Sequence, residues 1–331
     1  MTGSDIARSL KAKLRLPIIG APMFIISTPK LVIAQCRAGI LGSFPALNAR
    51  PKEALDDWLS EIKETLADHT ARHPERPAAP FAVNQIVHRS NDRLEHDLAL
   101  CVKHKVPIVI TSLGARPEVN EAIHSYGGIV FHDIINIQHA RKALEKGADG
   151  LIAVCAGAGG HAGTLSPFAL VQEIRQFFDG PLLLSGSIAN GRSVLAAEAM
   201  GADFAYAGSV FIATEEANAI DAYKQCLVDA RAEDIVYTNL FTGIHGNYLR
   251  QSIEAAGLDP ANLPQSDPSR MNFGSGGNEA KKAWRDIWGC GQGIGVIDDI
   301  KPVAAVVDLM EREYNAAKAA LLGPRDALAA E

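Results

Sequence analysis

A single histidine lies in the middle of a glycine-rich segment that directly follows an apolar run. The segment reads Ala158-Gly159-Gly160-His161-Ala162-Gly163, and the run before it, Gly150–Val154, is typical of a buried strand. Histidine can take up or release a proton near neutral pH, and glycines let the backbone turn tightly and approach a ligand. We predict that this segment is an active-site loop with His161 as its catalytic residue. The alternative is a flexible surface turn.

Two other apolar runs end in glycine turns that suit an anion. Pro181–Ser187 leads into a helical pattern, and Phe204–Phe211 contains a second glycine–serine pair. Backbone N–H groups at a helix start attract a negatively charged group. We therefore predict a phosphate cradle; the alternative is two tight turns without a ligand. The residues predicted for the cradle are Gly186, Ser187, Gly191, Gly208 and Ser209.

Two further runs end in residues that suit a flat ring. Ala21, Pro22 and Met23 close the first run, where small residues and a proline let a ring lie against the backbone. Asn84 is a polar residue near the end of an otherwise apolar run, and a buried amide needs hydrogen-bond partners. We predict that these residues contact the ring. The alternatives are a core position for Met23 and a hydrogen bond to a neighbouring loop for Asn84.

Apolar runs that alternate with amphipathic stretches would position these residues. Such runs are typical of parallel strands buried on both faces. They are Pro17–Met23, Gly39–Phe44, Phe81–Ile86, Ile108–Leu113, Ile129–Ile134, Gly150–Ala156, Pro181–Ser187 and Phe204–Phe211. The helical stretches include Pro51–Leu66, Asn91–His104, Ile137–Lys146, Phe168–Phe178 and Gly191–Met200. This α/β pattern predicts a (β/α)₈ TIM barrel rather than a doubly wound open sheet, because the phosphate signals follow the seventh and eighth runs.

The pattern becomes irregular and rich in turns after about residue 233, until a final helical stretch, Pro302–Leu322. We predict that residues 1–233 and 301–323 form the barrel. Residues 234–300 are predicted to be an inserted lid segment that covers the barrel mouth.

Three more side chains are candidates for a substrate pocket. His245 and Tyr248 lie in the predicted lid segment, and His132 lies near the end of the fifth run. The alternatives are plain loop positions for the first two and a core position for His132. The tail from residue 324 onward is expected to be frayed.

Composition argues against several classes of protein. The 331 residues carry a net charge of −6 with a pI of about 5.9, which argues against a nucleic-acid or acidic-membrane partner. Five scattered cysteines without a CxxC pair indicate reduced thiols, so we expect neither a disulfide frame nor a metal site. The N-terminus does not read as a signal peptide, and no apolar run is long enough to span a bilayer. We expect a cytoplasmic protein.

Together the motifs resemble those of the nitronate monooxygenase family, formerly called 2-nitropropane dioxygenases. Members carry, in chain order, P-I-x-x-(G/A)-x-M, F-x-V-N, A-G-G-H-x-G, S-G-(G/S)-I-x-(D/N)-G and G-(T/S)-x-F-x-A-T. A late loop that lies beside the flavin follows in that family. The corresponding segments here are Pro17–Met23, Phe81–Asn84, Ala158–Gly163, Ser185–Gly191, Gly208–Thr214 and Gly289–Asp298.

The resemblance implies a TIM barrel with non-covalent FMN. The ring would lie near Gly20–Met23 and Asn84, the loop Ala158–Gly160 would also bind the cofactor, and the phosphate would lie on the predicted cradle. His161 matches the histidine that faces the flavin and acts on the substrate. Several relatives have a lysine near the flavin where this chain has Asp133. A carboxylate there cannot stabilise an anionic reduced flavin as a lysine would, so either Asp133 points elsewhere or the flavin's electronics differ.

The resemblance implies FMN-dependent oxidation of alkyl nitronates by O₂, with His161 orienting the substrate or taking a proton from a neutral nitroalkane. The first alternative is an NAD(P)H-dependent FMN reductase acting on a quinone or an enoyl thioester. A flavin-free enzyme similar to IMP dehydrogenase would instead need a nucleophilic cysteine, for which Cys155 is the candidate. A phospho-ligand-binding module would not need His161 at all. NAD(P)H and a second copy of the chain stay open as partners beside the small-molecule substrate and O₂.

Overall fold

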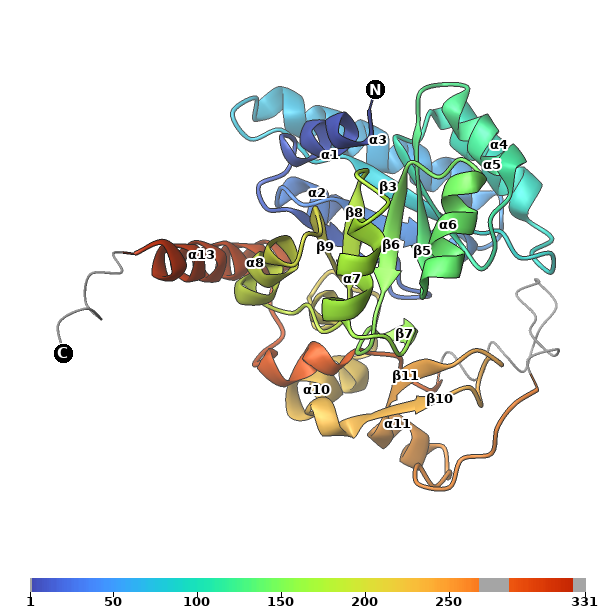
Figure 1. Ribbon diagram of the computed structural model, residues 1–331, viewed down its shortest axis with the longest axis vertical. Coiled ribbons are helices and arrows are strands. Elements are labelled where there is room, and N and C mark those ends of the chain that lie inside the picture. The colour runs from blue at the N-terminus through green and yellow to red at the C-terminus, as the bar shows by residue number, and fades with distance from the viewer. Residues whose placement is uncertain (1, 268–285, 324–331) are drawn as a thin grey trace.

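The computed structural model describes residues 2–267 and 286–323. Residues 268–285 of the predicted lid segment and the tail predicted to be frayed lie outside the described residues. Figure 1 shows a large α/β body with a smaller lobe below it. In the described ranges, none of the helices combines the length and the apolar composition that crossing a membrane requires.

Eight parallel strands form the body, which confirms the predicted (β/α)₈ barrel. Hydrogen bonds join the strands in the order β1-β9-β8-β6-β5-β4-β3-β2. The ring closes between β1 and β2, where the N–H of Gly20 donates to the carbonyl of Leu41 at 2.7 Å. The strands are β1 (Ile18–Gly20), β2 (Gly42–Pro45), β3 (Phe81–Ile86), β4 (Ile108–Ser112), β5 (Ile129–Ile134), β6 (Gly150–Val154), β8 (Leu182–Ser185) and β9 (Phe204–Ala207).

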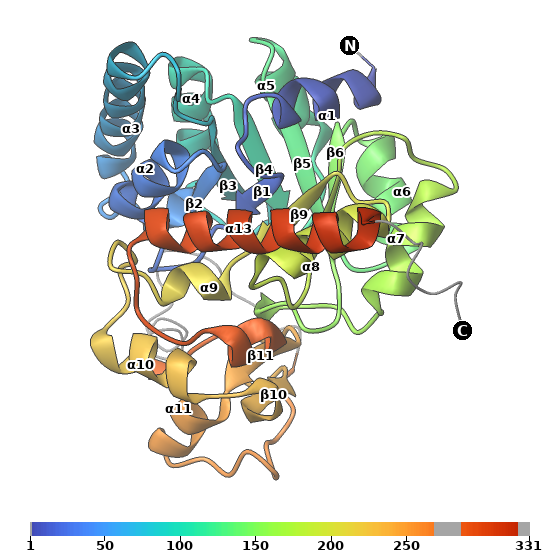
Figure 2. The ribbon, with the colours of Figure 1, turned by 90° about the vertical axis from the view of Figure 1, so that its left-hand side faces the viewer.

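Helices cover the outside of the barrel and one of its ends. They are α1 (Gly3–Lys11), α2 (Pro29–Arg37), η1 (Ala46–Asn48), α3 (Ala54–Arg72), α4 (Leu94–His104), α5 (Pro117–His124), α6 (Ile137–Glu145), α7 (Pro167–Arg175), α8 (Gly191–Ala199), α9 (Ser209–Ile212) and α13 (Val303–Leu322). Helix α13 packs along α8 and α2 (Figure 2). Helix α1 lies at the end of the barrel away from the lobe (Figure 1), and its Ala7 and Leu10 join the core inside the barrel.

Side-chain alternation divides each strand between two cores. Successive residues of a strand point to opposite faces. Ile110, Phe131 and Ile152 lie inside the barrel, whereas Val109 and Val130 belong to a core between the strands and the outer helices. Both faces are therefore buried, which explains why the strands read as nearly continuous apolar runs.

The structure corrects two predicted elements. The run predicted as a strand from Phe204 to Phe211 is a strand only to Ala207, and Ser209–Ile212 form the short helix α9. Apolar periodicity cannot separate a helical turn from a strand over so few residues. Helix α3 begins at Ala54 rather than at Pro51, because the N–H of Ala54 closes a turn on the carbonyl of Pro51 at 3.1 Å.

A small antiparallel sheet organises the lobe. Its strands lie in the order β10-β11-β7, and β7 is contributed by the loop that follows β6. The predicted active-site loop is therefore joined to the lobe by strand pairing. Figures 1 and 2 place α10 in the lobe as well, although the sequence assigned its residues to the barrel. The lobe elements are β7 (Gly160–His161), α10 (Asp221–Asp229), η2 (Ala232–Asp234), β10 (Ile235–Thr238), β11 (Gly246–Leu249), α11 (Arg250–Ala255) and η4 (Gln292–Val296).

Candidate active site

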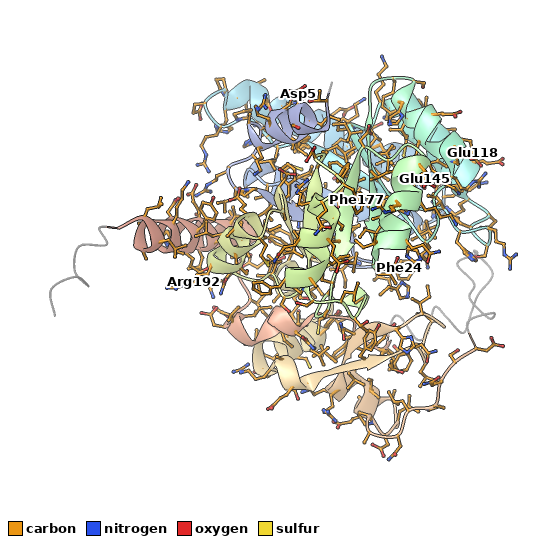
Figure 3. The ribbon with its side chains drawn as sticks, in the orientation of Figure 1. Asp5, Phe24, Glu118, Glu145, Phe177 and Arg192 are labelled. Carbon is orange, nitrogen blue, oxygen red and sulfur yellow. The ribbon has the colours of Figure 1, made fainter. Side chains whose placement is uncertain are left out.

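A cavity of about 1940 Å³ lies at the carboxyl ends of the barrel strands. Ligand pockets usually measure roughly 300–1,000 Å³, so this cavity has room for a cofactor and a substrate together. Lobe residues such as Leu240, Thr242 and Trp288 complete its wall. Figure 3 shows Phe24, another wall residue, near the boundary between the barrel and the lobe. TIM-barrel enzymes keep their active sites at this end of the barrel.

Most residues selected from the sequence line this cavity. They come from loops and strand ends distributed around the barrel, which the shared direction of the strands brings to one face. They are Ala21, Pro22, Met23, Asn84, His132, Asp133, Ala158, Gly159, Gly160, His161, Gly186, Ser187, Gly208 and Ser209. Their placement is an observation, and their individual roles stay predictions.

The two lobe residues predicted for the pocket do not line it. Tyr248 is 1% exposed and packs in an apolar cluster with Ile253 and Ile287. His245 stacks on Tyr237, with 5.1 Å between the ring centroids. Tyr248 therefore belongs to the core of the lobe, whereas His245 is exposed, and neither residue is in the cavity wall that was predicted for it.

Gly191 also lies away from the cavity, at the start of α8. Its N–H donates to Oε2 of Glu313 at 2.8 Å, so a carboxylate of the chain itself occupies the position predicted for the phosphate. A Cβ at Gly191 would lie 2.0 Å from the carbonyl oxygen of Met310, so glycine is needed for the close approach of α13. The role of Gly191 is structural, and the predicted cradle reduces to Gly186, Ser187, Gly208 and Ser209.

Replacement of Glu313 tests this reassignment. Glu313→Ala removes the carboxylate that caps α8, and we expect the free energy of unfolding to fall by about 1–2 kcal/mol. The affinity for flavin should not change, because Glu313 does not line the cavity. Chemical denaturation and flavin titration measure the two quantities. A loss of flavin affinity without a loss of stability would contradict the reassignment.

Strand pairing fixes His161 in the cavity wall. His161 lies on β7 and pairs with Gly246 of β11, while the carbonyl of His245 accepts the N–H of Ala162 at 3.2 Å. Gly246 must be small, because a Cβ there would lie 2.7 Å from the carbonyl oxygen of Gly160. The lobe therefore decides where the imidazole sits over the end of the barrel.

Burial and one hydroxyl set the protonation of His161. Burial lowers the pKa of the imidazole to about 4, so His161 is neutral at neutral pH. Its Nε2 lies 2.9 Å from Oγ1 of Thr242, which donates its one hydrogen to the carbonyl of Ile244 at 3.0 Å. With the Thr242 hydroxyl donated to Ile244, Nε2–H of His161 donates to Thr242, and the imidazole lone pair lies on Nδ1.

The glycines of the His161 loop serve chain packing. A Cβ at Gly159 would lie 2.7 Å from the backbone nitrogen of Gly291. A Cβ at Gly157 would lie 2.3 Å from Oγ of Ser187, and Gly157 has a φ of +84°. The carbonyl of Gly157 also accepts the N–H of Gln292 at 2.9 Å. At these two positions glycine lets other segments of the chain, including Gly291 and Gln292, pack closely against the His161 loop. The sequence pattern instead predicts that the glycines allow a ligand to approach.

Three polar side chains on adjacent strands form a hydrogen-bonded chain inside the barrel mouth. Nδ2 of Asn84 on β3 donates to Oγ of Ser112 on β4 at 2.7 Å. Oγ of Ser112 donates to Oδ2 of Asp133 on β5 at 2.5 Å. Burial raises the pKa of Asp133 to about 6, although the Ser112 hydrogen bond acts in the opposite direction. Asp133 is among the residues that line the cavity, and its effect on a flavin stays a prediction.

His132 alternates with Asp133 and lies on the other face of β5. Its Nδ1 is 2.6 Å from Oγ1 of Thr111, and burial lowers its pKa to about 4. The residue reaches the edge of the cavity but is 6% exposed. Its pocket role stays a prediction, and the Thr111 contact also gives it a structural role.

Cys155 cannot serve as the nucleophile that an IMP-dehydrogenase-like enzyme requires. Its side chain is 0% exposed and packs in the core outside the strands. Burial raises the pKa of the thiol to about 12, so the reactive thiolate is absent at neutral pH. That alternative loses its catalytic residue.

Comparison with known proteins decides the family. The family model described as nitronate monooxygenase matches residues 7–312. The chain belongs to the nitronate monooxygenase family. It is accordingly a flavin-dependent oxidoreductase, and the motif segments quoted above lie within the matched region.

Individual relatives of this nitronate monooxygenase family member agree with the assignment. The chain is 28% identical to the nitronate monooxygenase of Paraburkholderia phytofirmans, with 90% of this chain and 92% of the relative covered. It is 30% identical to the putative monooxygenase Rv1533 of Mycobacterium tuberculosis, where 66% of this chain aligns with 61% of the relative. The alignment thus spans less than two thirds of that second relative.

Solved structures with similar folds cover nearly the whole chain. FabK from Thermotoga maritima is 25% identical, with a TM-score of 0.74 and 96% of this chain and 97% of that chain covered. The nitroalkane oxidase of Streptomyces ansochromogenes is 23% identical, with a TM-score of 0.78 and 94% and 99% covered. The second likeness supports the barrel fold alone.

One side of the cavity suits the negatively charged group of a cofactor. At the ends of β8 and β9 the wall offers glycine backbone and the hydroxyls of Ser187 and Ser209. Oγ of Ser209 accepts the N–H of Gly291 at 2.8 Å, which leaves its own hydrogen for another acceptor. Three carboxylates among the described residues line the cavity, but none lies at the ends of β8 and β9. Glu53 follows β2, Asp92 follows β3, and Asp133 lies on β5. The donor set therefore fits a flavin phosphate.

Sequence reasoning missed three residues of the site. Ser112 follows the same pattern as Asn84, a polar residue at the end of an apolar run, and that signal could have found it. Tyr206 lines the cavity from within β9, but an aromatic residue in an apolar run gives no functional signal. Thr242, the partner of His161, lies in the irregular part of the lobe, and no pattern there points to it.

Proposed function

We propose that this protein is an FMN-dependent enzyme that oxidises alkyl nitronates with O₂. The observation that carries the proposal is the position of His161, which strand pairing holds in the wall of a cavity at the carboxyl end of the barrel. Family membership supports flavin chemistry at this end. The combination of the His161 imidazole with an anion-binding side suits a small anionic substrate placed over a flavin.

The residues of the cavity divide the work of binding. Gly186, Ser187, Gly208 and Ser209 would hold the FMN phosphate, while Ala21–Met23 and Asn84 would contact the ring system. FMN, when bound, supplies the electron-accepting centre. The lobe wall around Leu240 and Trp288 would limit the access of water to the substrate.

His161 would act on the substrate as a neutral imidazole. Nδ1 is the ring nitrogen that would take the carbon-bound proton of a neutral nitroalkane. A pKa of about 4 makes this imidazole a weak base at neutral pH. The site is therefore better suited to a nitronate that has already lost its proton, because that substrate needs no base.

Oxygen consumption with defined substrates tests the proposed function. We expect the purified protein to release one FMN per chain on heat denaturation and to consume O₂ with an alkyl nitronate. Turnover should be slower with the corresponding neutral nitroalkane. A protein that ignores nitronates but oxidises NAD(P)H with a quinone or an enoyl thioester would replace the proposal with the reductase alternative.

A further inference from the structure

One carboxyl oxygen in the barrel mouth is buried without a hydrogen-bond partner. Oδ2 of Asp133 accepts the hydroxyl of Ser112, but Oδ1 of Asp133 has no partner among the described residues. A buried carboxyl oxygen left unpaired is costly, so it marks a position where a ligand completes the contact. Asp133 lines the cavity in which such a ligand would bind.

The hydrogen-bonded chain behind Asp133 fixes which oxygen can carry a proton. Asn84 donates one amide hydrogen to the carbonyl of Ile110 at 3.1 Å and the other to Oγ of Ser112 at 2.7 Å. Ser112 has a single hydroxyl hydrogen, and it points to Oδ2 of Asp133. Oδ2 is therefore held as an acceptor, and a proton on this carboxyl group sits on Oδ1, the oxygen that lacks a partner.

The groups that face Asp133 do not neutralise it with a fixed positive charge. Tyr206 projects from β9, and both burial and the Asp133 carboxylate raise its pKa, so it stays neutral. His161 shares the cavity, and His132 is the preceding residue; burial lowers the pKa of each imidazole to about 4. Within the described part of the chain, burial and Ser112 are the influences on the Asp133 pKa. Charged side chains line other parts of the cavity, namely Arg50, Lys52, Arg93, Lys142, Glu53 and Asp92, but none of them is among the causes of the Asp133 shift.

We propose that Asp133 is a proton-holding residue of the active site, whose Oδ1 carries a proton and donates a hydrogen bond to an electron-rich, negatively charged acceptor bound in the cavity. The proton comes from solvent and stays on Oδ1, so no other bond forms or breaks. The identity of the acceptor rests on the proposed function: it is an oxygen or nitrogen at the edge of the flavin ring, or an oxygen of the nitronate. In either case the hydrogen bond depends on a proton that Asp133 holds only at lower pH.

The proposal fixes the sign of a pH effect. The protonated carboxyl favours the acceptor, and the ionised carboxyl repels it. The pKa of Asp133 is therefore higher in the bound state than in the free state, where it is about 6. The affinity should be constant below the free pKa and fall by up to about tenfold per pH unit above it.

A titration of the protein without flavin tests the carboxyl group itself. The infrared difference between wild type and Asp133→Asn should show one carboxyl that titrates near pH 6. Ser112→Ala removes the hydrogen bond that stabilises the ionised form, so it should raise that pKa further. Thr111→Val is the matched control, because Thr111 contacts His132 on the other face of the sheet and should leave the pKa of Asp133 unchanged.

Binding measurements test whether the proton serves a ligand. One arm titrates the flavin-free protein with FMN between pH 5 and 8, and the other titrates the FMN-loaded protein with inorganic nitrate, an unreactive planar oxyanion. The FMN phosphate titrates in this range too, so each wild-type affinity is divided by that of Asp133→Asn, whose amide donates at every pH. In at least one arm the ratio of the wild-type affinity to the Asp133→Asn affinity should fall above pH 6. The corresponding ratio for Ser112→Ala should begin to fall at a higher pH.

The two arms identify the acceptor, since dependence in the FMN arm points to the flavin ring and dependence in the nitrate arm points to the substrate oxyanion. The proposal is overturned if no carboxyl titrates near pH 6 in the difference spectrum, or if the affinity ratio is flat in both arms. The carboxyl titration does not depend on turnover. A protein that fails to oxidise nitronates can therefore still confirm the proposed role of Asp133, and a protein that oxidises nitronates can still contradict it.

Discussion

His161→Ala is expected to keep FMN bound while the turnover of neutral nitroalkanes falls by roughly 10²–10⁴-fold, the usual contribution of general acid–base catalysis. The turnover of nitronates should fall less, because that substrate has already lost its proton. FMN should remain because the predicted phosphate contacts lie at the ends of β8 and β9, on the barrel itself. Steady-state oxygen consumption with both substrates measures the two losses.

Two further variants separate the possible roles of His161. His161→Gln can still donate a hydrogen bond toward Thr242 but cannot take up a proton, so it should restore orientation without restoring base catalysis. His124→Ala is the control, since His124 pairs with Asp149 on the outside of the barrel and should leave turnover unchanged. Wild-type rates with both substrates in His161→Ala would remove His161 from the mechanism.

Gly208→Leu is expected to weaken FMN binding by roughly 10- to 100-fold while the barrel stays folded, as the cost of filling an occupied space suggests. A Cβ at Gly208 would lie 3.5 Å from Cβ of Ala21 and 3.6 Å from Sδ of Met23, which are ordinary contacts. The Cβ therefore fits in the flavin-free protein, and the rest of the leucine side chain would extend into the cavity predicted for the flavin. Fluorescence titration with FMN measures the affinity.

The choice of Gly208 over Gly186 keeps this experiment interpretable. Gly186 has a φ of +141°, and a Cβ there would lie 2.8 Å from the carbonyl oxygen of Ala156, so a substitution would strain the fold itself. Gly295→Leu is the matched control, because a Cβ at Gly295 would meet only Cδ of Arg231 at 3.6 Å among the described atoms. Unchanged FMN affinity in a folded Gly208→Leu would contradict the predicted cofactor site.

Local patterns were sufficient to predict the barrel and most of the residues around its mouth. The runs Phe81–Ile86 and Ile129–Ile134 match β3 and β5 in their bounds, because parallel strands buried on both faces leave a continuous apolar signal. Once the order of strands is known, the residues at their carboxyl ends must converge. Asn84, His161 and Gly208 could therefore be grouped without knowing any contact between them.

The errors arose where distant segments compete for the same position. Gly191 reads as an anion site from its helix start, but its N–H is taken by Glu313, 122 residues further along the chain. His245 and Tyr248 lie where the sequence is irregular, and only the pairing of β11 with β7 and β10 shows what they contact. The chain from Asn84 through Ser112 to Asp133 depends on strand register, which apolar patterns do not encode.

Anaerobic mixing of the FMN-loaded protein with an alkyl nitronate tests the central claim most directly. We expect the nitronate to bleach the flavin absorbance and added O₂ to restore it, with His161→Ala slowing the bleaching less for the nitronate than for the neutral nitroalkane. A flavin that stays oxidised with nitronate but is bleached by NAD(P)H would contradict the proposed function and leave the reductase alternative in its place.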